Sequence, residues 1–443
     1  MKKYFYVLLF FIACFNRVNA QIDTFDIGQF ILPEVSLKSL NFSGTFSGDV
    51  RNQSTLINTG DNIRQNINVI LAYNNFESDY HHQKVTFGNL FLSGAYQNAA
   101  TDFFTGQAVQ DQISNVISLF YDRINRNYYE PERFYGLEAS VFLNNNFESY
   151  EANGNIRYYE NRLQTNVGIP FIYGFGRIEP VTDAWHAVRI LEDFERFGLL
   201  DQTPDSEAIF DLAQKLSDLR YERIFESRFG RIRRIKSLDD YIQKAGLVND
   251  HGSSYFTSLY DIYEFGLQTT RSSGERLTFG IGPQFSIQQF ANDSTSTFNI
   301  DYGGFVFGNY VFNYPINQEW QLDIEAAVSA TYLLDSDQIL SNNFSALPEL
   351  TIKTGFYPNT RTFFTSAVST GILYASNLEL SNKFAFYFSL AGNAYYFFSP
   401  RTALSINVGF NYSQSAFVSS LTPFLQSEGY RFNYAVQLNH ALY

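Results

Sequence analysis

The chain of 443 residues has very little cysteine: its only one, Cys14, lies within the first twenty residues. A single cysteine can form no intramolecular disulfide, and the residues that follow it can supply neither a thiolate nucleophile nor a cysteine ligand for a metal. Disulfide frameworks, zinc ribbons and cysteine-based catalysis are therefore excluded for the chain beyond Cys14.

Long hydrophobic runs are also missing. The longest apolar stretch, from Tyr4 to Phe15, has about a dozen residues, whereas a membrane-spanning helix needs about 20. Lys2 and Lys3 precede this stretch and Val18-Asn19-Ala20 follows it, which is the pattern of an export signal. We therefore expect residues 1–20 to be a cleaved signal peptide.

Cleavage after Ala20 makes Gln21 the first residue of the mature chain, and residues 21–38 then form an N-terminal periplasmic segment. An alternative is a lipoprotein signal that ends at Cys14. It fits less well, because Phe11 stands where such signals usually have Leu and because a good cleavage site follows at Ala20.

Positive charge is scarce, since 31 Lys and Arg stand against 44 Asp and Glu, for a formal net charge of −13. We expect no nucleic-acid partner, because nucleic acids are bound through basic surfaces. Aromatic residues are abundant, with 31 Tyr, 46 Phe and 2 Trp, although the mean hydropathy is only −0.18. This combination suits strands with one face in lipid and the other in water.

Apolar and polar residues alternate with a period of two over much of the chain. From Trp320 to Leu334 the even positions are apolar, while the odd positions are mostly polar or small. The same period is found over 383–398 and 404–412, and again near the front between Leu40 and Val50. Alternation over about 9–11 residues is typical of strands that span an outer membrane.

Six such strands precede a central interruption and eight follow it, so we predict about 14. They occupy barrel segments 39–178 and 264–443. The candidates lie near 40–50, 64–77, 83–97, 112–128, 134–147, 155–169, 276–290, 298–313, 320–334, 344–357, 361–375, 383–398, 404–412 and 428–443.

The predicted links after residue 276 alternate in length. Three short ones carry X-Pro pairs suited to turns, at 314–318, 357–361 and 399–401, and longer polar ones lie near 291–297, 335–343, 376–381 and 416–427. Because bacterial barrels place short turns in the periplasm, both chain ends and the interruption are expected on the periplasmic side.

The interruption, residues 181–250, is rich in charge and has helical spacing. We predict one helix with Thr182 or Asp183 as its N-cap and Gly198 just beyond its end, a second capped by Thr203 with Pro204 at its first position, and a third that stops at Gly246. Together they form a helical insertion over 179–263, packed at the barrel rim or in the lumen as a plug. Residues 264–271 are either a short strand or a link.

The signal peptide, the alternating aromatic strands and the terminal Tyr443 resemble the outer-membrane β-barrel class of Gram-negative bacteria. The resemblance implies an all-β transmembrane antiparallel β-barrel of about 14 strands (12–16), with an α-helical periplasmic insertion, in the bacterial outer membrane. In this class an outward-facing aromatic residue typically ends the chain. Here Tyr443 is one position out of phase with the apolar row that includes Tyr430 and Leu442.

Within that class we expect a channel or transporter for small solutes. The alternative is a non-conducting structural or assembly subunit that docks a periplasmic or outer-membrane protein through the insertion, and a third possibility is a lipid-modifying enzyme. Outer-membrane lipids are expected partners in each case, and neither a cofactor nor catalysis is expected.

Charged residues at predicted inward positions are the candidate lumen lining. In a narrow pore they would set ion selectivity, or they would pair with one another across a filled lumen. They are Asp49, Glu138, Asp301, Asp323, Glu325, Glu349, Lys353, Lys383 and Arg431.

The densest basic run lies in the insertion and is the candidate docking face for an anionic partner or lipid headgroups. The other interpretation is a solvated helix whose bases pair with nearby acids. The residues are Arg228, Arg231, Arg233, Arg234 and Lys236.

The sequence offers weak signals for metal sites and catalysis. His81 and His82 are adjacent, so they lie in a turn or point to opposite faces of a strand, and neither arrangement chelates well. Asp335 and Asp337 are better explained as solvated loop acids than as calcium ligands. No nucleophile-elbow or metalloprotease motif is present, and no metal or catalytic residues are predicted.

Overall fold

The computed structural model describes residues 25–31, 34–54, 59–101, 108–152, 156–221, 227–249, 251–265, 270–335, 343–376, 384–399, 402–413 and 429–440. The predicted signal peptide, Lys383 and Tyr443 lie outside these residues.

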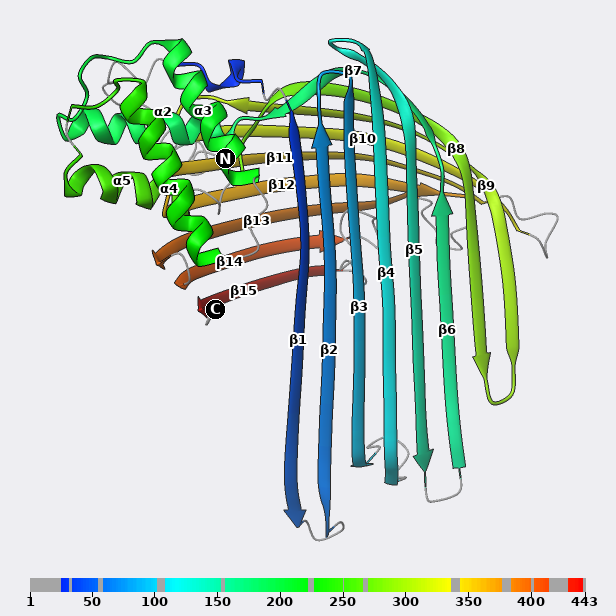
Figure 1. The fold of residues 1–443 in the computed structure, drawn as a ribbon. Helices are drawn as coiled ribbons and strands as arrows, with labels where there is room; N and C mark the ends of the chain where they lie inside the picture. The colour runs from blue at the N-terminus through cyan, green and yellow to red at the C-terminus, as the bar shows by residue number, and fades with distance from the viewer. Residues whose placement is uncertain are drawn as a thin grey trace, which may run out of the picture.

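One antiparallel sheet contains all the described strands, and successive strands pair with each other except β6 and β7 (Figure 1). The strands before the helices are β1 (Val35–Ser54), β2 (Thr59–Ser78), β3 (His82–Thr101), β4 (Ala108–Glu130), β5 (Arg133–Ala152), β6 (Ile156–Gly168) and β7 (Phe171–Pro180). Those after them are β8 (Ser272–Asn292), β9 (Ser296–Pro315), β10 (Trp320–Asp335), β11 (Asn343–Asn359), β12 (Thr362–Ala375), β13 (Phe384–Ser399), β14 (Thr402–Ser413) and β15 (Gly429–His440).

β6 and β7 together fill one position in the sheet. Both pair with β5 on one side and with β8 on the other. The break falls at Ile169 and Pro170, where proline cannot donate a ladder hydrogen bond. Gly282 faces this break, and a Cβ added there would lie 2.4 Å from the Pro170 Cα. The 15 strands therefore occupy 14 positions, as the alternation predicts.

The register aligns apolar side chains on one face of the sheet and polar side chains on the other across neighbouring strands. Trp320 pairs with Phe356, which pairs with Phe364, so aromatic residues form a row on one face. On the opposite face Asp323 pairs with Lys353. We call the first the outer face and the second the inner face. The outer face exposes many large apolar side chains, including Phe42 and Phe432.

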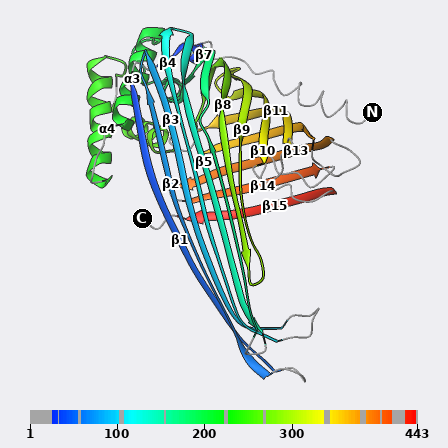
Figure 2. The ribbon, with the colours of Figure 1, turned by 90° about the vertical axis from the view of Figure 1, so that its right-hand side faces the viewer.

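The first and last strands, β1 and β15, are the two ends of the ladder among the described residues. Figures 1 and 2 show a strongly curved sheet in which β1–β6 run nearly across β10–β15, with β8 and β9 bending from one direction to the other.

Four helices lie between β7 and β8: α2 (Thr182–Arg196), α3 (Ser206–Tyr221), α4 (Ser227–Lys244) and α5 (Ser253–Phe265). We call them the helical module. The first three lie at the predicted places, whereas α5 was not predicted. Because α5 ends at Phe265, the first residues of the segment 264–271, expected as a strand or a link, are helical.

The predicted N-cap residues of the first two helices are wrong. The cap of α2 is Val181, because the Thr182 hydroxyl is used instead as a hydrogen-bond donor to the Arg271 carbonyl, at 3.3 Å. The α3 helix begins at Ser206 rather than after Thr203, since the Asp205 carboxylate accepts the Ala208 N–H at 2.9 Å.

The main hydrophobic core belongs to this module, and it extends onto the sheet and the N-terminal segment. It contains Trp185, Phe194 and Leu216 together with Tyr357 of β11 and Phe30. Among the described residues no helix combines the length and apolarity needed to cross a membrane.

The link predicted as long at 291–297 is instead a tight hairpin between β8 and β9. Asn292 causes this, because its side-chain oxygen accepts the N–H groups of Ser294 and Thr295, at 3.0 and 2.7 Å. Asparagine closes turns in this way readily.

Candidate functional site: the inner face and its helical rim

The inner face carries eight of the nine charged residues predicted to line a lumen, and Lys383 is the one not described. Their positions follow from the register, which places each on the same side as Asp323. They are Asp49 on β1, Glu138 on β5, Asp301 on β9, Asp323 and Glu325 on β10, Glu349 and Lys353 on β11, and Arg431 on β15.

Three of these charges are brought together, across β10 and β11. Asp323 pairs with Lys353 in the register, and Glu325 lies two residues along on the same face. Amides complete the group: Asn313 donates to Asp323 at 2.8 Å, and Asn309 donates to Glu325 at 3.0 Å. Asp49, Glu138 and Arg431 lie on distant strands, so the predicted set is not one cluster.

Two rows of polar side chains cross β5, β6, β8 and β9, and the sequence reasoning missed them. Asn144, Gln164, Gln288 and Asn299 are successive partners in the register, so four amides stand side by side. The adjacent row is Asn146, Arg162, Phe290 and Thr297. These eight side chains line a hollow of about 490 Å³.

Arg271, immediately before β8, joins the module to the short turn between β9 and β10. Its guanidinium donates to the carbonyls of Asn317, Gln318 and Trp320 at 2.7–2.8 Å and is almost fully buried. It also lies 5.6 Å from the centre of the Trp185 ring. Burial lowers the pKa of Arg271 to about 10, so it stays charged at neutral pH.

Further contacts fix the module to the same end of the sheet. The Trp185 indole N–H donates to the Gln318 carbonyl at 2.7 Å, and Arg189 donates to the Tyr357 carbonyl at 3.2 Å. Asp261 of α5 pairs with Arg361 in the β11–β12 turn. All these contacts lie at the short-turn rim, and Figure 1 likewise shows the helices gathered at one end of the strands.

A buried polar group holds α2 to α3. Arg220 donates to the Asp183 carboxylate and to Nδ1 of His186, the latter at 2.7 Å. Because arginine has no acceptor, Nδ1 must accept and the imidazole proton must lie on Nε2. Burial, followed by the charges of Arg220, Arg271 and Arg189, holds the pKa of His186 well below its ordinary value.

Because His186 is buried in its neutral form, we expect the folded helical module to lose stability in acid. The folded state keeps His186 neutral while an unfolded chain protonates it near pH 6.5, so its stabilising effect is complete above that pH and is lost as pH falls below it. We expect protease cleavage of α2–α5 to rise by up to about tenfold per pH unit between pH 6.5 and 5. His186→Gln, which keeps an acceptor for Arg220, should flatten the profile, and an equally steep profile in that variant would contradict the assignment.

The predicted docking residues lie on α4, which packs on α3 and is the outermost helix in Figure 2. Arg233 and Lys236 are exposed and Arg234 is partly buried, while the side chains of Arg228 and Arg231 lie outside the described part of the structure. Ile232 is 58% exposed beside them.

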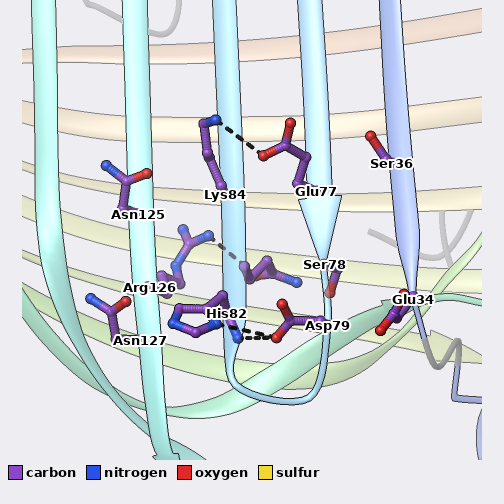
Figure 3. A pocket seen from close by; sticks show the side chains of 11 residues that line it. Glu34, Ser36, Glu77, Ser78, Asp79, His82, Lys84, Asn125, Arg126 and Asn127 are labelled. Carbon is purple, nitrogen blue, oxygen red and sulfur yellow. Dashed lines mark hydrogen bonds and ion pairs between the residues drawn. The ribbon is translucent and has the colours of Figure 1, made fainter.

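A polar patch interrupts the outer face near the β2–β3 turn. In the register Ser36, Glu77, Lys84 and Asn125 form one row on the face that carries Leu40. Glu77 pairs with Lys84 at 3.0 Å and with Lys38 at 2.7 Å, as Figure 3 shows for the first. The row lines a hollow of about 550 Å³. Following the period of two down to the turn would have found it.

The two histidines lie at this turn. His82 begins β3 and its Nδ1 is 3.3 Å from the Asp79 carboxylate, while His81 is in the turn itself. In the described ranges no group of three or more His, Cys, Asp or Glu is placed to hold a metal ion.

The fold and the two-faced sheet define the class: the chain has the architecture of the outer-membrane β-barrel proteins. No family model matches the chain, and no curated protein matches its sequence. Among solved structures it is similar to in-vitro folded OmpT, an outer membrane protein of Vibrio cholerae, at 7% identity and a TM-score of 0.26, over 95% of this chain and 99% of that one.

Two structures from Acinetobacter baumannii are also similar. CdiB matches at 8% identity and a TM-score of 0.30, over 91% of this chain and 65% of that one. OccAB1 matches at 8% identity and a TM-score of 0.25, over 95% and 99%. The class assignment depends on the chain's own strand order and faces rather than on these scores.

Proposed function

We propose that the protein is an outer-membrane channel for small polar solutes, with the helical module at its periplasmic mouth. The observation that supports this proposal is the difference between the two faces of the sheet. Its outer face is apolar except for the patch near the β2–β3 turn, its inner face carries the charged and amide rows, and the described hydrogen bonds and ion pair that hold the module lie at the short-turn rim. Polar lining away from the rim suits passage of water-soluble molecules.

A pore also requires that β1 and β15 meet. In the described residues the ladder ends at these two strands. Because the number of positions is even, β1 and β15 would be antiparallel neighbours in a closed ring. Each backbone group left unpaired in hydrocarbon costs several kcal/mol, which favours closure in the membrane.

The experiment is planar-bilayer conductance of the full-length protein and of a variant without the module. The ends of the module lie together, since Pro180 pairs with Ser272 and the Val181 N–H donates to the Arg271 carbonyl at 2.9 Å. A short glycine turn can therefore replace residues 182–270. We expect the variant to conduct several-fold more than the full-length protein, because its mouth is open.

Detergent without protein is the control for membrane leakage. Absence of conductance from both proteins would refute the channel. Equal conductance would refute the assignment of the module to the mouth.

A second candidate is a docking subunit, favoured by the exposed Ile232, Arg233 and Lys236 on the outermost helix. A basic surface with an apolar centre fits a periplasmic protein with an acidic face. This function gains support if neither protein conducts while the full-length chain co-purifies with such a partner and the shortened chain does not.

A further inference from the structure

We propose that the inner face binds a neutral polyhydroxylated solute, an oligosaccharide, on the amide rows of β5, β6, β8 and β9. This inference deepens the proposed function, because it names the substrate class of the same face. The rows lie far along the strands from the module, close to the β8–β9 hairpin, whose Asn292 is four residues beyond Gln288.

The amide row can form many hydrogen bonds with a solute. Each Asn or Gln side chain offers two donor hydrogens and one acceptor oxygen. Within the described part of the chain, the side-chain amides of Asn144, Gln164, Gln288 and Asn299 make no hydrogen bond with another protein group. Neighbouring strands are about 4.8 Å apart, so the row presents a regular line of both donors and acceptors. Sugar hydroxyls, which both donate and accept, match such a line.

The two rows carry little charge. The only ion in the two rows is Arg162, and its guanidinium already pairs with the Glu160 carboxylate. The site is therefore close to neutral, and an anionic solute would gain little attraction from it while it would face Glu160. This separates the amide rows from the charged group of Asp323, Glu325 and Lys353.

The second row also has a suitable shape. The guanidinium of Arg162 lies 5.5 Å from the centre of the Phe290 ring, so the second row offers a flat surface with outward N–H groups. The hollow of about 490 Å³ falls in the range of about 300–1,000 Å³ found for small-molecule sites. A flat surface beside a line of amides fits a sugar ring, which has apolar C–H faces and a polar edge.

The test is calorimetric titration of the full-length protein with maltohexaose, and with hexagalacturonate as an anionic probe of the same length. The detergent must have no sugar headgroup, since a maltoside would compete. We expect saturable binding of maltohexaose and at least tenfold weaker binding of hexagalacturonate.

Gln164→Leu and Gln288→Leu should each weaken maltohexaose binding about tenfold, the effect of one or two lost hydrogen bonds. Gln65→Leu is the matched control, because Gln65 lies on the outer face of β2. Circular dichroism and heat-dependent gel mobility show whether each variant is folded.

Three results would overturn the inference: no saturable binding by the folded protein, preference for the anionic probe, or equal binding by the Gln288→Leu and Gln65→Leu variants. Because binding is measured without conductance, the two proposals can fail separately. A protein that conducts but does not bind maltohexaose retains the channel function, whereas one that binds but does not conduct loses it and keeps the site.

Discussion

Arg271→Ala is expected to release the helical module from the sheet and to speed its cleavage by trypsin about a hundredfold. The side chain is almost fully buried and donates to the carbonyls of Asn317, Gln318 and Trp320. Each of the three lost hydrogen bonds is worth about 1 kcal/mol. The Gln318 and Trp320 carbonyls keep the Trp185 indole and the Ile316 N–H as donors, whereas the Asn317 carbonyl loses the donor that Arg271 supplied. A total of about 3 kcal/mol corresponds to roughly a hundredfold more of the open form.

The measurement is the rate of limited proteolysis in detergent, with cleavage inside α2–α5 followed by mass spectrometry. Arg271→Lys should give an intermediate rate, since an ammonium cannot reproduce the planar fork of donors. Arg133→Ala is the control: this arginine is 52% exposed and its partner Glu130 is equally exposed, so little change is expected. Cleavage of Arg271→Ala at the wild-type rate would mean that other contacts hold the module.

Arg220→Ala is expected to destabilise the module by about 3–5 kcal/mol, the range found when one partner of a buried ion pair is removed. The side chains of Arg220 and Asp183 are only 5% and 2% exposed. The variant leaves the Asp183 carboxylate buried without this cation and takes the donor away from His186 Nδ1.

The double variant Asp183→Ala/Arg220→Ala distinguishes the ion pair from simple loss of packing. It should be more stable than Arg220→Ala alone, because it removes the uncompensated carboxylate. Urea unfolding of the module, followed by Trp185 fluorescence, measures both. If the two effects add, the pair does not stabilise the α2–α3 contact.

The alternation of side chains predicted the strand positions because it is a local property. Each strand shows its two faces in its own residues, as Trp320 to Leu334 does, and the facing of Asp323 or Glu349 follows directly. The break between β6 and β7 was missed because a run of residues shows no pairing, so nothing marked Phe171–Pro180 as a continuation of the same position.

The helix α5 was missed for a different reason. Tyr255, Leu259, Ile262 and Tyr263 have helical spacing and are buried, but serine and aromatic residues in this segment also suit a strand. Which side chains are neighbours across strands could not be predicted from the sequence at all. Gln164 and Gln288 are 124 positions apart, and only the register between β6 and β8 shows that they are adjacent.

The outer polar patch has a consequence for how deeply the protein sits in a bilayer. On β2 the apolar row ends at Tyr73, and the turn residue Asp79 follows six positions later, which is about 20 Å of strand. On β11 and β12 the aromatic residues Phe356 and Phe364 come within a few residues of their turn. We therefore expect the boundary of the hydrocarbon to cross the wall obliquely, with the β2–β3 hairpin extending into water on one side of the molecule.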